Sequence, residues 1–398
     1  MSDPATDAAP TPFGNYQYEI YLRGLAGELP EHPISWDELE RAAAEALDPG
    51  ALGYVFGGAG REDTQRENLE ALRRHRIVPR MLRDVATRDL RTTVLGTAMP
   101  APLLLAPVGV QSIIHPDGEL AVARAAAALG VPMVASTASS FTLEEIAEAG
   151  GGAAAPRWFQ LYWPKSDDLA ESFVARAEAA GYGAIVVTLD TPLLAWRPRD
   201  LAQAYLPFLK SVGIANYLAD PVFRAALERS PEEDPQGAVG HFVGQFSNPS
   251  ATWAGVDRLR ALTDLPLVLK GINHPDDARE ALARGVDGVI VSNHGGRQVD
   301  GAVGAIDALP RVVDAVGDEL TVLFDSGIRS GADIMKALAL GADAALLGRP
   351  YLWGLALGGE AGVRAVLRAM LGELDLTLAL SGHATPATVD GSVLTQRP

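Results

Sequence analysis

From Pro102 onward, short and almost continuous apolar runs alternate with longer Ala-rich stretches of helical periodicity. Such apolar runs are typical of strands that are buried on both faces of a sheet. The predicted strands are 103–107, 133–136, 158–162, 184–189, 267–270, 289–292, 322–325 and 344–347. Most of them are separated by predicted helices, such as 119–129, 169–180, 275–284 and 332–340.

Eight strand–helix units in a row predict an α/β fold, namely a (β/α)8 TIM barrel of parallel strands. A doubly wound open sheet is the alternative that the same alternation allows. We prefer the barrel because eight nearly continuous apolar strands match its repeat.

Some segments do not fit the repeat. Ser35-Trp-Asp-Glu38 reads as a capping box that opens a helix through Leu47, and a second helix is expected over about 62–74. These helices would form an N-terminal extension over about 36–100. The stretch of about 200–248, between the fourth and fifth strands, contains Pro, Gly and a charged run, and we interpret it as a lid. Tails are expected at 1–13 and 376–398, flanking one domain at 14–375.

Composition excludes several classes of function. The formal net charge of −17 argues against a nucleic-acid or anionic-membrane surface. The absence of cysteine excludes disulfides, thiolate metal sites and a cysteine nucleophile. No apolar run reaches the roughly 18 residues of a membrane helix, and residues 1–13 lack the regions of a secretory signal. We therefore expect a cytoplasmic protein without a membrane or nucleic-acid partner. No metal site is expected either, because four histidines lack partners at ligand spacing: His115, His241, His274 and His383.

Almost every predicted strand ends in a polar residue or glycine. In barrels of this kind the site lies at the carboxyl ends of the strands. These ends read Pro107-Val-Gly109, Ser136-Thr137, Gln160-Leu-Tyr162, Thr188-Leu-Asp190, Lys270, Ser292-Asn-His294, Asp325-Ser-Gly327 and Gly348-Arg349. We therefore expect one polar site along this rim.

The run Ser292-Asn-His-Gly-Gly-Arg-Gln298 follows the sixth predicted strand. A histidine titrates near neutral pH and serves as a base after modest tuning. An arginine presents a planar fork that matches the two oxygens of a carboxylate. His294 and Arg297 together therefore indicate chemistry on a 2-hydroxy acid.

The loops after the last two strands indicate a phosphate site. Gly327 with Arg329, and Gly348 with Arg349, combine close backbone approach with positive charge where barrels commonly bind phosphate. No Gly-x-Gly-x-x-Gly fingerprint follows a first strand, which disfavours a Rossmann-type NAD site. Redox chemistry would then point to a flavin held by its phosphate.

The chain resembles the FMN-dependent 2-hydroxy acid oxidase/dehydrogenase family, which includes glycolate oxidase, over about residues 36–375. The run from Ser292 to Gln298 matches that family's signature. Within the family the likeness is greatest to the lactate 2-monooxygenase branch. That likeness is carried by Tyr18-Glu-Ile-Tyr21, Trp196-Arg-Pro-Arg-Asp-Leu201, Asn216-Tyr217, Asp220-Pro-Val-Phe223 and Phe324-Asp-Ser-Gly-Ile-Arg329.

The resemblance implies roles for the substrate-facing residues. His294 would remove a proton from the substrate, and Asp190 would pair with His294. Arg297 and Arg197 would hold the substrate carboxylate. Two tyrosines would contact the substrate as well: Tyr54 near its carboxylate and Tyr162 at the oxygen of the reacting carbon. Read without the resemblance, Tyr54 would be a core residue.

The resemblance also implies FMN as the cofactor. Lys270 would lie beside the flavin N1/O2 edge, and Asp325 would bind the ribityl hydroxyls. The ring would rest on Pro107, Val108 and Gly109. The ring's rim or side chain would be bonded by Ser136, Gln160, Thr188 and Ser292. The phosphate would be held by Gly327, Arg329, Gly348 and Arg349.

The predicted reaction is that of a lactate 2-monooxygenase, which converts lactate and O2 to acetate, CO2 and water. The alternatives are an oxidase that releases the 2-oxo acid and hydrogen peroxide, a dehydrogenase with another electron acceptor, an FMN-dependent isomerase and a flavin-binding protein without turnover. Ala138 stands where several relatives carry a bulky aromatic, so longer or aromatic acids are also expected to fit. The resemblance implies a homotetramer or homo-octamer.

Overall fold

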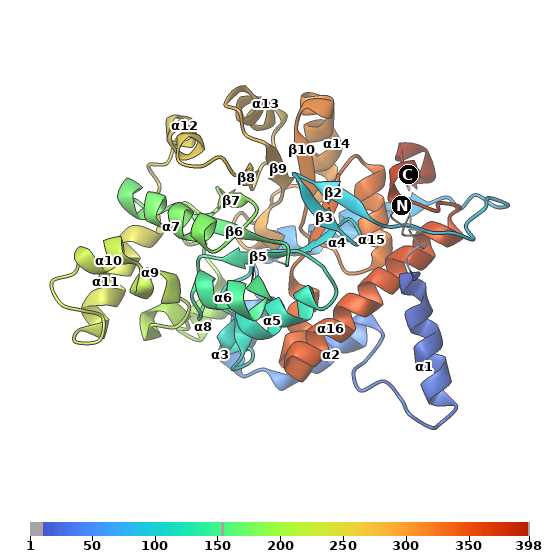
Figure 1. The fold of residues 1–398 in the computed structure, drawn as a ribbon, viewed down its shortest axis with the longest axis horizontal. Coiled ribbons are helices and arrows are strands. Elements are labelled where there is room, and N and C mark those ends of the chain that lie inside the picture. Colours follow the sequence, from blue (N-terminus) through green and yellow to red (C-terminus); the bar gives the residue numbers. More distant parts are fainter. Residues whose placement is uncertain (1–10, 153–154, 397–398) are drawn as a thin grey trace, which may run out of the picture.

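The computed structural model describes residues 11–152 and 155–396 and shows a closed barrel at its centre (Figure 1). The eight strands are parallel and follow the order β10-β11-β4-β5-β6-β7-β8-β9 around the barrel. Their bounds are β4 (Leu103–Leu105), β5 (Met133–Ser136), β6 (Arg157–Tyr162), β7 (Ile185–Thr188), β8 (Leu267–Lys270), β9 (Gly288–Val291), β10 (Thr321–Phe324) and β11 (Ala344–Leu347). The (β/α)8 barrel and all eight predicted strands are confirmed.

Helices surround the barrel (Figure 1). They are α5 (Gly118–Ala127), α6 (Leu143–Ala149), α7 (Asp167–Ala179), α12 (Trp253–Ala261), α13 (Pro275–Ala283), α14 (Ala305–Val316), α15 (Gly331–Ala339) and α16 (Arg349–Leu380). Alternate strand residues form a buried cluster that includes Leu104, Trp158 and Ile290, while their neighbours pack in a second cluster with helix residues. Both faces of each strand are therefore apolar, which explains the continuous runs in the sequence.

The N-terminal region is helical only as far as Arg74. It contains η1 (Phe13–Asn15), α1 (Tyr16–Gly24), α2 (Trp36–Ala46), α3 (Pro49–Phe56) and α4 (Asp63–Arg74), followed by β1 (His75–Ile77), β2 (Thr92–Val94) and β3 (Thr97–Met99). The helical extension expected over 36–100 is thus too long at its C-terminal end. The expected capping box is wrong, because the Ser35 side chain makes no capping hydrogen bond to α2.

The C-terminal boundary expected at residue 375 falls inside α16. Asp375 is buried and accepts hydrogen bonds from Gly14 N and from the Arg88 guanidinium. Beyond η7 (Pro386–Thr388) and η8 (Gly391–Val393), β12 (Leu394–Gln396) pairs antiparallel with β1. The end of the chain therefore belongs to the domain body as far as residue 396, whereas most of the tail expected at 1–13 lies outside the described residues.

The stretch expected to be a lid folds into short helices, which we call the 198–246 segment. They are α8 (Pro198–Ala202), η4 (Pro207–Lys210), α9 (Ala215–Ala219), α10 (Pro221–Ala225) and α11 (Pro235–Phe246). Proline occupies one of the first helical positions in α8, η4, α10 and α11. In the sequence these prolines indicated a loop, but in the structure they start helices. The fixed φ of proline suits the first turn of a helix, and its missing N–H is not needed there.

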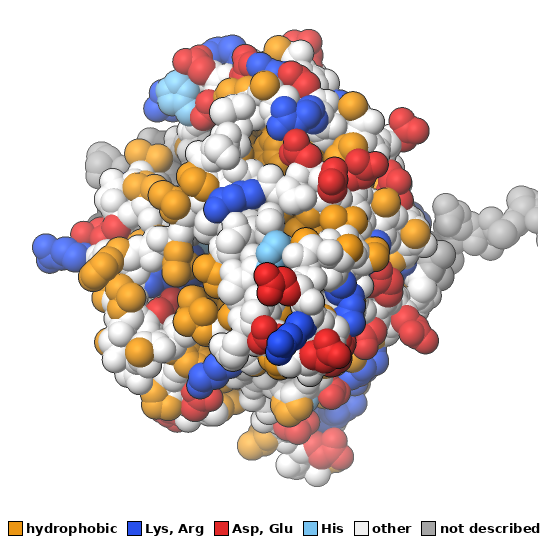
Figure 2. Space-filling model, turned by 90° about the vertical axis from the view of Figure 1, so that its left-hand side faces the viewer, with side chains coloured by type: hydrophobic (Ala, Val, Ile, Leu, Met, Phe, Trp, Pro, Cys, Tyr) orange, Lys and Arg blue, Asp and Glu red, His pale blue; other side chains and the backbone are white. Residues whose placement is uncertain are grey.

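The outer surface of this side of the molecule carries mixed charge. Figure 2 shows acidic, basic and apolar side chains interspersed on the face that lies to the left in Figure 1. None of the helices in the described parts of the chain has the length and apolarity to cross a bilayer. Within the same residues, no group of three or more His, Asp or Glu side chains is placed to hold a metal ion.

Candidate active site

Most of the predicted site residues line one cavity at the carboxyl ends of the strands. They are Tyr54, Pro107, Val108, Gly109, Tyr162, Arg197, Lys270, His294, Arg297, Asp325, Gly327, Arg329, Gly348 and Arg349. The residues predicted to bind the cofactor and those predicted to bind the substrate therefore line the same cavity.

His294 and Asp190 form a hydrogen-bonded pair at one side of the cavity. His294 follows β9 with a left-handed backbone (φ 58°), and its Nδ1 lies 2.8 Å from Oδ1 of Asp190, which follows β7. Burial lowers the pKa of His294 despite the opposing effect of Asp190, so the imidazole is neutral near pH 7. A neutral ring that donates its Nδ1–H to Asp190 leaves Nε2 free to accept a proton.

The carboxylate of Asp190 keeps its charge although burial opposes it. Its pKa is lowered, because the neighbouring His294 and Lys270 outweigh the desolvation of the carboxylate. An anion beside the ring stabilises the imidazolium that forms when His294 takes a proton. The pair can therefore act as a base and its orienting partner.

Arg297 and Arg197 place two guanidinium groups in the same cavity. Arg297 Nη1 donates to the carbonyl oxygens of Tyr54 and Gly57, both at 2.6 Å, while Arg197 Nη2 donates to Gln298 Oε1 at 2.7 Å. Burial and the nearby Arg197 lower the pKa of Arg297 to about 10. Neither guanidinium is hydrogen-bonded to a carboxylate among the described residues. Two buried like charges of this kind call for an anion, and a substrate carboxylate fits that need.

Two tyrosines complete the substrate side of the cavity. The Tyr54 ring lies 5.2 Å from the Arg297 guanidinium, and the Tyr162 ring packs 5.0 Å from the Phe246 ring. Burial raises the pKa of both hydroxyls, so each stays protonated and can donate a hydrogen bond. The interpretation of Tyr54 as a core residue holds in part. The residue is buried, as a core residue would be, but it also lines the cavity.

Lys270 remains a cation in spite of its burial. Its Nζ donates to Ser292 Oγ at 2.8 Å and lies 3.2 Å from Asp325 Oδ2. Burial alone would lower the pKa of Lys270, but Asp325 and Asp190 together raise it. A fixed positive charge at this place can stabilise negative charge on a bound cofactor.

Several predicted residues lie behind the cavity wall instead of lining it. The Ser136 hydroxyl donates to Gln160 Oε1 at 3.0 Å, and Gln160 Nε2 donates to Thr188 Oγ1 at 2.9 Å. Ser292 is fully buried against Lys270. These four side chains thus bond to their neighbours, and Asp190 reaches the site through His294.

The loops after β10 and β11 bring Arg329 and Arg349 together. Arg349 donates to the carbonyl oxygens of Val55 and Gly295 at 3.0 and 3.2 Å. Arg329 lies 5.2 Å from the Trp353 ring, and its buried Nε has no hydrogen-bond partner among the described residues. Burial lowers the pKa of both guanidinium groups, and Arg329 lowers that of Arg349 further.

This pair fits a phosphate group. An unpartnered buried donor beside a second cation is costly unless an anion binds there. Gly327 has a φ of +106°, and a Cβ at this position would lie 2.9 Å from the Asn68 carbonyl oxygen. The backbone after β10 therefore needs glycine, and the first turn of α16 adds the positive end of a helix.

Some residues of the site were missed from the sequence. Gln298 holds the Arg197 guanidinium and donates to the Asp190 carbonyl oxygen at 2.7 Å. Ser326 Oγ accepts from the backbone amides of Asn293 and Gly295. Gln298 stands within the quoted signature run and could have been found there. Phe208 and Phe246 also line the cavity, and both lie in the stretch that the sequence predicts to be a lid.

Comparison with known proteins identifies the family. A family model described as FMN-dependent dehydrogenase matches residues 43–396. The chain belongs to this family. It is 44% identical to the L-lactate oxidase of Lysinibacillus sphaericus over 92% of this chain and 93% of the relative. It is 40% identical to 2-hydroxyacid oxidase 1 of Homo sapiens, over 92% and 97% of the respective chains.

A solved structure agrees with this assignment. The crystal structure of a mandelate oxidase superimposes with a TM-score of 0.81 at 41% identity, covering 92% of this chain and 98% of that chain. This member of the FMN-dependent dehydrogenase family is therefore an FMN-dependent 2-hydroxy acid oxidoreductase. The Arg329–Arg349 pair offers the positive charge that the phosphate group of FMN would need.

Proposed function

We propose that this enzyme is a lactate 2-monooxygenase, converting L-lactate and O2 to acetate, CO2 and water. The observation that carries the hydroxy acid chemistry is the His294–Asp190 pair in the cavity that also holds the guanidinium groups of Arg297 and Arg197. A base and a carboxylate site in one cavity are the groups that proton removal from a bound 2-hydroxy acid needs.

The side chains divide the work in the following way. Arg297 and Arg197 bind the substrate carboxylate, and the Tyr54 hydroxyl donates to it. Tyr162 donates to the oxygen on the reacting carbon. His294 Nε2 takes the proton that leaves the substrate, and Asp190 stabilises the imidazolium. FMN, when bound, accepts the two electrons from the hydroxy acid and delivers them to the acceptor.

The fate of the 2-oxo acid separates two versions of this activity. If the 2-oxo acid stays in the site, peroxide formed beside it attacks its carbonyl and drives decarboxylation. If it leaves first, the products are the 2-oxo acid and hydrogen peroxide. The folded 198–246 segment beside the cavity and the likeness to the monooxygenase branch favour retention. The names of the relatives favour the oxidase, because L-lactate oxidases and 2-hydroxyacid oxidase 1 are among them.

The cavity favours acids larger than lactate as additional substrates. Part of its lining is apolar and includes Ala138, Phe208 and Phe246. A small side chain at Ala138 leaves room for an alkyl or aryl group. Two relatives of this family are named for such acids, 4-hydroxymandelate oxidase and mandelate oxidase.

We also propose a cytoplasmic homotetramer or homo-octamer. Helix α1 has no buried residue, and its apolar side chains Tyr18, Tyr21 and Leu22 are exposed. A helix of this kind gains most by packing against another copy of the chain. Light scattering on the purified protein measures the mass, and a monomer would contradict the proposal.

One experiment in two stages tests the proposed reaction. The purified yellow protein is mixed with L-lactate without oxygen, and loss of the visible flavin absorption shows that the substrate reduces the cofactor. Air is then admitted, and CO2 and peroxide are measured. CO2 with acetate supports the monooxygenase, stoichiometric peroxide without CO2 shows an oxidase, and slow reoxidation by O2 shows a dehydrogenase. A flavin that no hydroxy acid bleaches would contradict the enzyme function altogether.

A further inference from the structure

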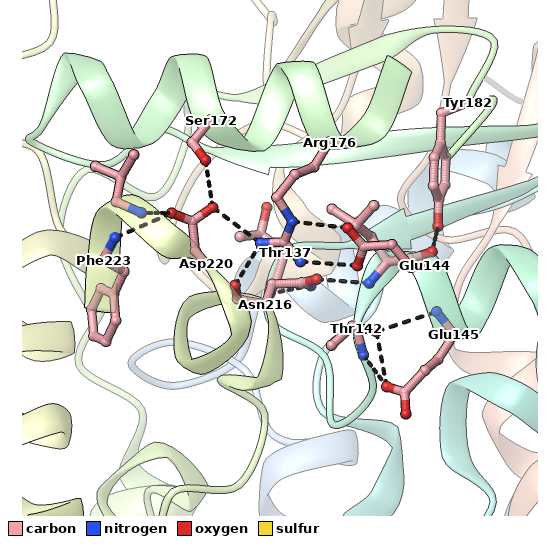
Figure 3. A network of polar contacts seen from close by, with 12 residues as sticks. Thr137, Thr142, Glu144, Glu145, Ser172, Arg176, Tyr182, Asn216, Asp220 and Phe223 are labelled. Atoms are coloured by element: carbon pink, nitrogen blue, oxygen red, sulfur yellow. Dashed lines mark hydrogen bonds and ion pairs between the residues drawn. The ribbon is translucent and has the colours of Figure 1, made fainter. Parts of the chain in front are cut away.

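One buried asparagine joins the 198–246 segment to the loop that follows β5. Asn216 of α9 is fully buried, and its Nδ2 donates to the Thr137 carbonyl oxygen at 3.0 Å (Figure 3). The same Nδ2 also donates to Ser139 Oγ at 2.9 Å. Its Oδ1 accepts from Leu143 N at 2.8 Å, at the start of α6. The amide is thus used on both sides and tolerates only one orientation.

The same segment is fixed to the barrel helix α7 one turn further on. The buried carboxylate of Asp220 accepts from Ser172 Oγ at 2.8 Å and from Arg176 Nη1 at 3.1 Å (Figure 3). Arg176 also donates to the Asn216 carbonyl oxygen at 2.9 Å and pairs with Glu144 of α6. Charge-assisted bonds of this kind among buried groups hold one arrangement of the elements.

An aromatic cluster continues from this attachment to the cavity. Tyr217 packs against Phe173 of α7 at 5.0 Å and against Phe242 of α11 at 4.8 Å. Phe242 packs against Phe246 at 5.0 Å, and Phe246 packs against Tyr162 at the same distance. The segment therefore has a core of its own that ends on a substrate-facing tyrosine, which a freely moving lid would not have.

We propose that Asn216 is a positioning residue that makes the 198–246 segment a fixed wall of the substrate pocket and so sets the preference among 2-hydroxy acids. This role of Asn216 rests on the proposed oxidation of a 2-hydroxy acid and concerns which acid is preferred. Asn216 touches no reacting atom; it acts through the loop that it holds.

Two connections lead from that loop to the substrate. Tyr162 N donates to Thr137 Oγ1 at 3.1 Å. Thr137 therefore connects Asn216 to Tyr162, the tyrosine that contacts the oxygen on the reacting carbon. Ala138 follows Thr137 and lines the cavity, and its carbonyl oxygen lies against Gly109, where an added Cβ would collide with it. A large substrate side chain meets Ala138 and Phe246, whereas the methyl group of lactate needs little of this wall.

The test compares two acids in the FMN-loaded enzyme. Asn216→Ala is expected to lower kcat/KM for (S)-mandelate by about tenfold more than for L-lactate, because small displacements of a positioning wall are costly for the substrate that uses it. The loss for mandelate is expected mainly in KM, since the base and the carboxylate site stay in place. Ser172→Ala is the matched control, because it removes one hydrogen bond of the same segment without touching the loop after β5. It is expected to leave the ratio of the two kcat/KM values unchanged.

A second variant covers a failure to fold. Asn216→Asp keeps the volume and the acceptor for Leu143 N, loses the amide donor and is expected to shift the ratio in the same direction. The proposal is contradicted if the two Asn216 variants and Ser172→Ala have the same ratio of kcat/KM for (S)-mandelate to kcat/KM for L-lactate at similar losses of Tm. If the wild-type flavin is bleached by neither acid, the proposed function fails instead, so the two failures are distinguishable.

Discussion

At the scale of single residues, catalysis depends on keeping one imidazole neutral and oriented. We expect His294→Ala to slow anaerobic flavin bleaching by about 100- to 10,000-fold, the usual contribution of a positioned base. The protein should stay yellow, because no part of the Arg329–Arg349 pair depends on His294. Stopped-flow bleaching and the bound FMN content measure the two properties separately. Loss of FMN in this variant would recast His294 as a structural residue.

The pH dependence tests the same residue through its charge. Burial lowers the pKa of His294, so the neutral form is present at and above the ordinary histidine range. We expect kcat/KM to rise with pH through the lowered pKa and then to level off. Asp190 opposes this lowering, so Asp190→Asn should move the acid limb to still lower pH while reducing the plateau. An acid limb that stays in place in Asp190→Asn would contradict the assigned pairing.

At the scale of elements, the phosphate loops make a prediction about the cofactor. The Arg329 Nε is buried and has no hydrogen-bond partner in the described parts of the chain, so Arg329→Ala removes a cation that is free to bind an anion. We expect FMN binding to weaken about tenfold or more, since hydrogen bonds to charged groups contribute roughly 1.5–3 kcal/mol. The Tm of the protein without FMN should not fall. Titration of FMN measures the Kd, and Arg279→Ala on the exposed surface of α13 is the control.

Whether an element could be predicted from the sequence depended on the local chemistry of its residues. The barrel strands were found because both of their faces are buried, which leaves continuous apolar runs such as Leu103–Leu105. The helices of the 198–246 segment were missed, because their prolines start helices instead of ending them and their core forms only in three dimensions. The sequence placed His294 and Arg297 by their motif, but the 2.8 Å contact of His294 with Asp190 joins positions 104 apart. The order of the strands, in which β8 pairs with both β7 and β9, brings the ends of β7 and β9 near enough for that contact.

At the scale of the whole molecule, one carboxylate joins both ends of the chain. Asp375 of α16 has a fully buried side chain that pairs with Arg88 at 2.7 Å, and it accepts from Gly14 N at 2.7 Å. Three distant parts of the sequence thus meet at one group, and none of these three residues lines the cavity. Removal of one partner from a buried pair leaves an uncompensated charge.

We therefore expect Asp375→Ala to lower the free energy of unfolding by about 3 kcal/mol, within the range for a broken buried ion pair. Both Arg88 and the Gly14 amide would lose their acceptor, so the N-terminal helices should come loose from α16 first. Urea unfolding measures the loss of stability, and Glu360→Ala is the control, since its ion pairs are partly exposed. The anaerobic bleaching rate of the folded variant should match that of the wild type. A slower rate would show that the attachment of the N-terminal helices also shapes the cavity, to which Tyr54 of α3 contributes.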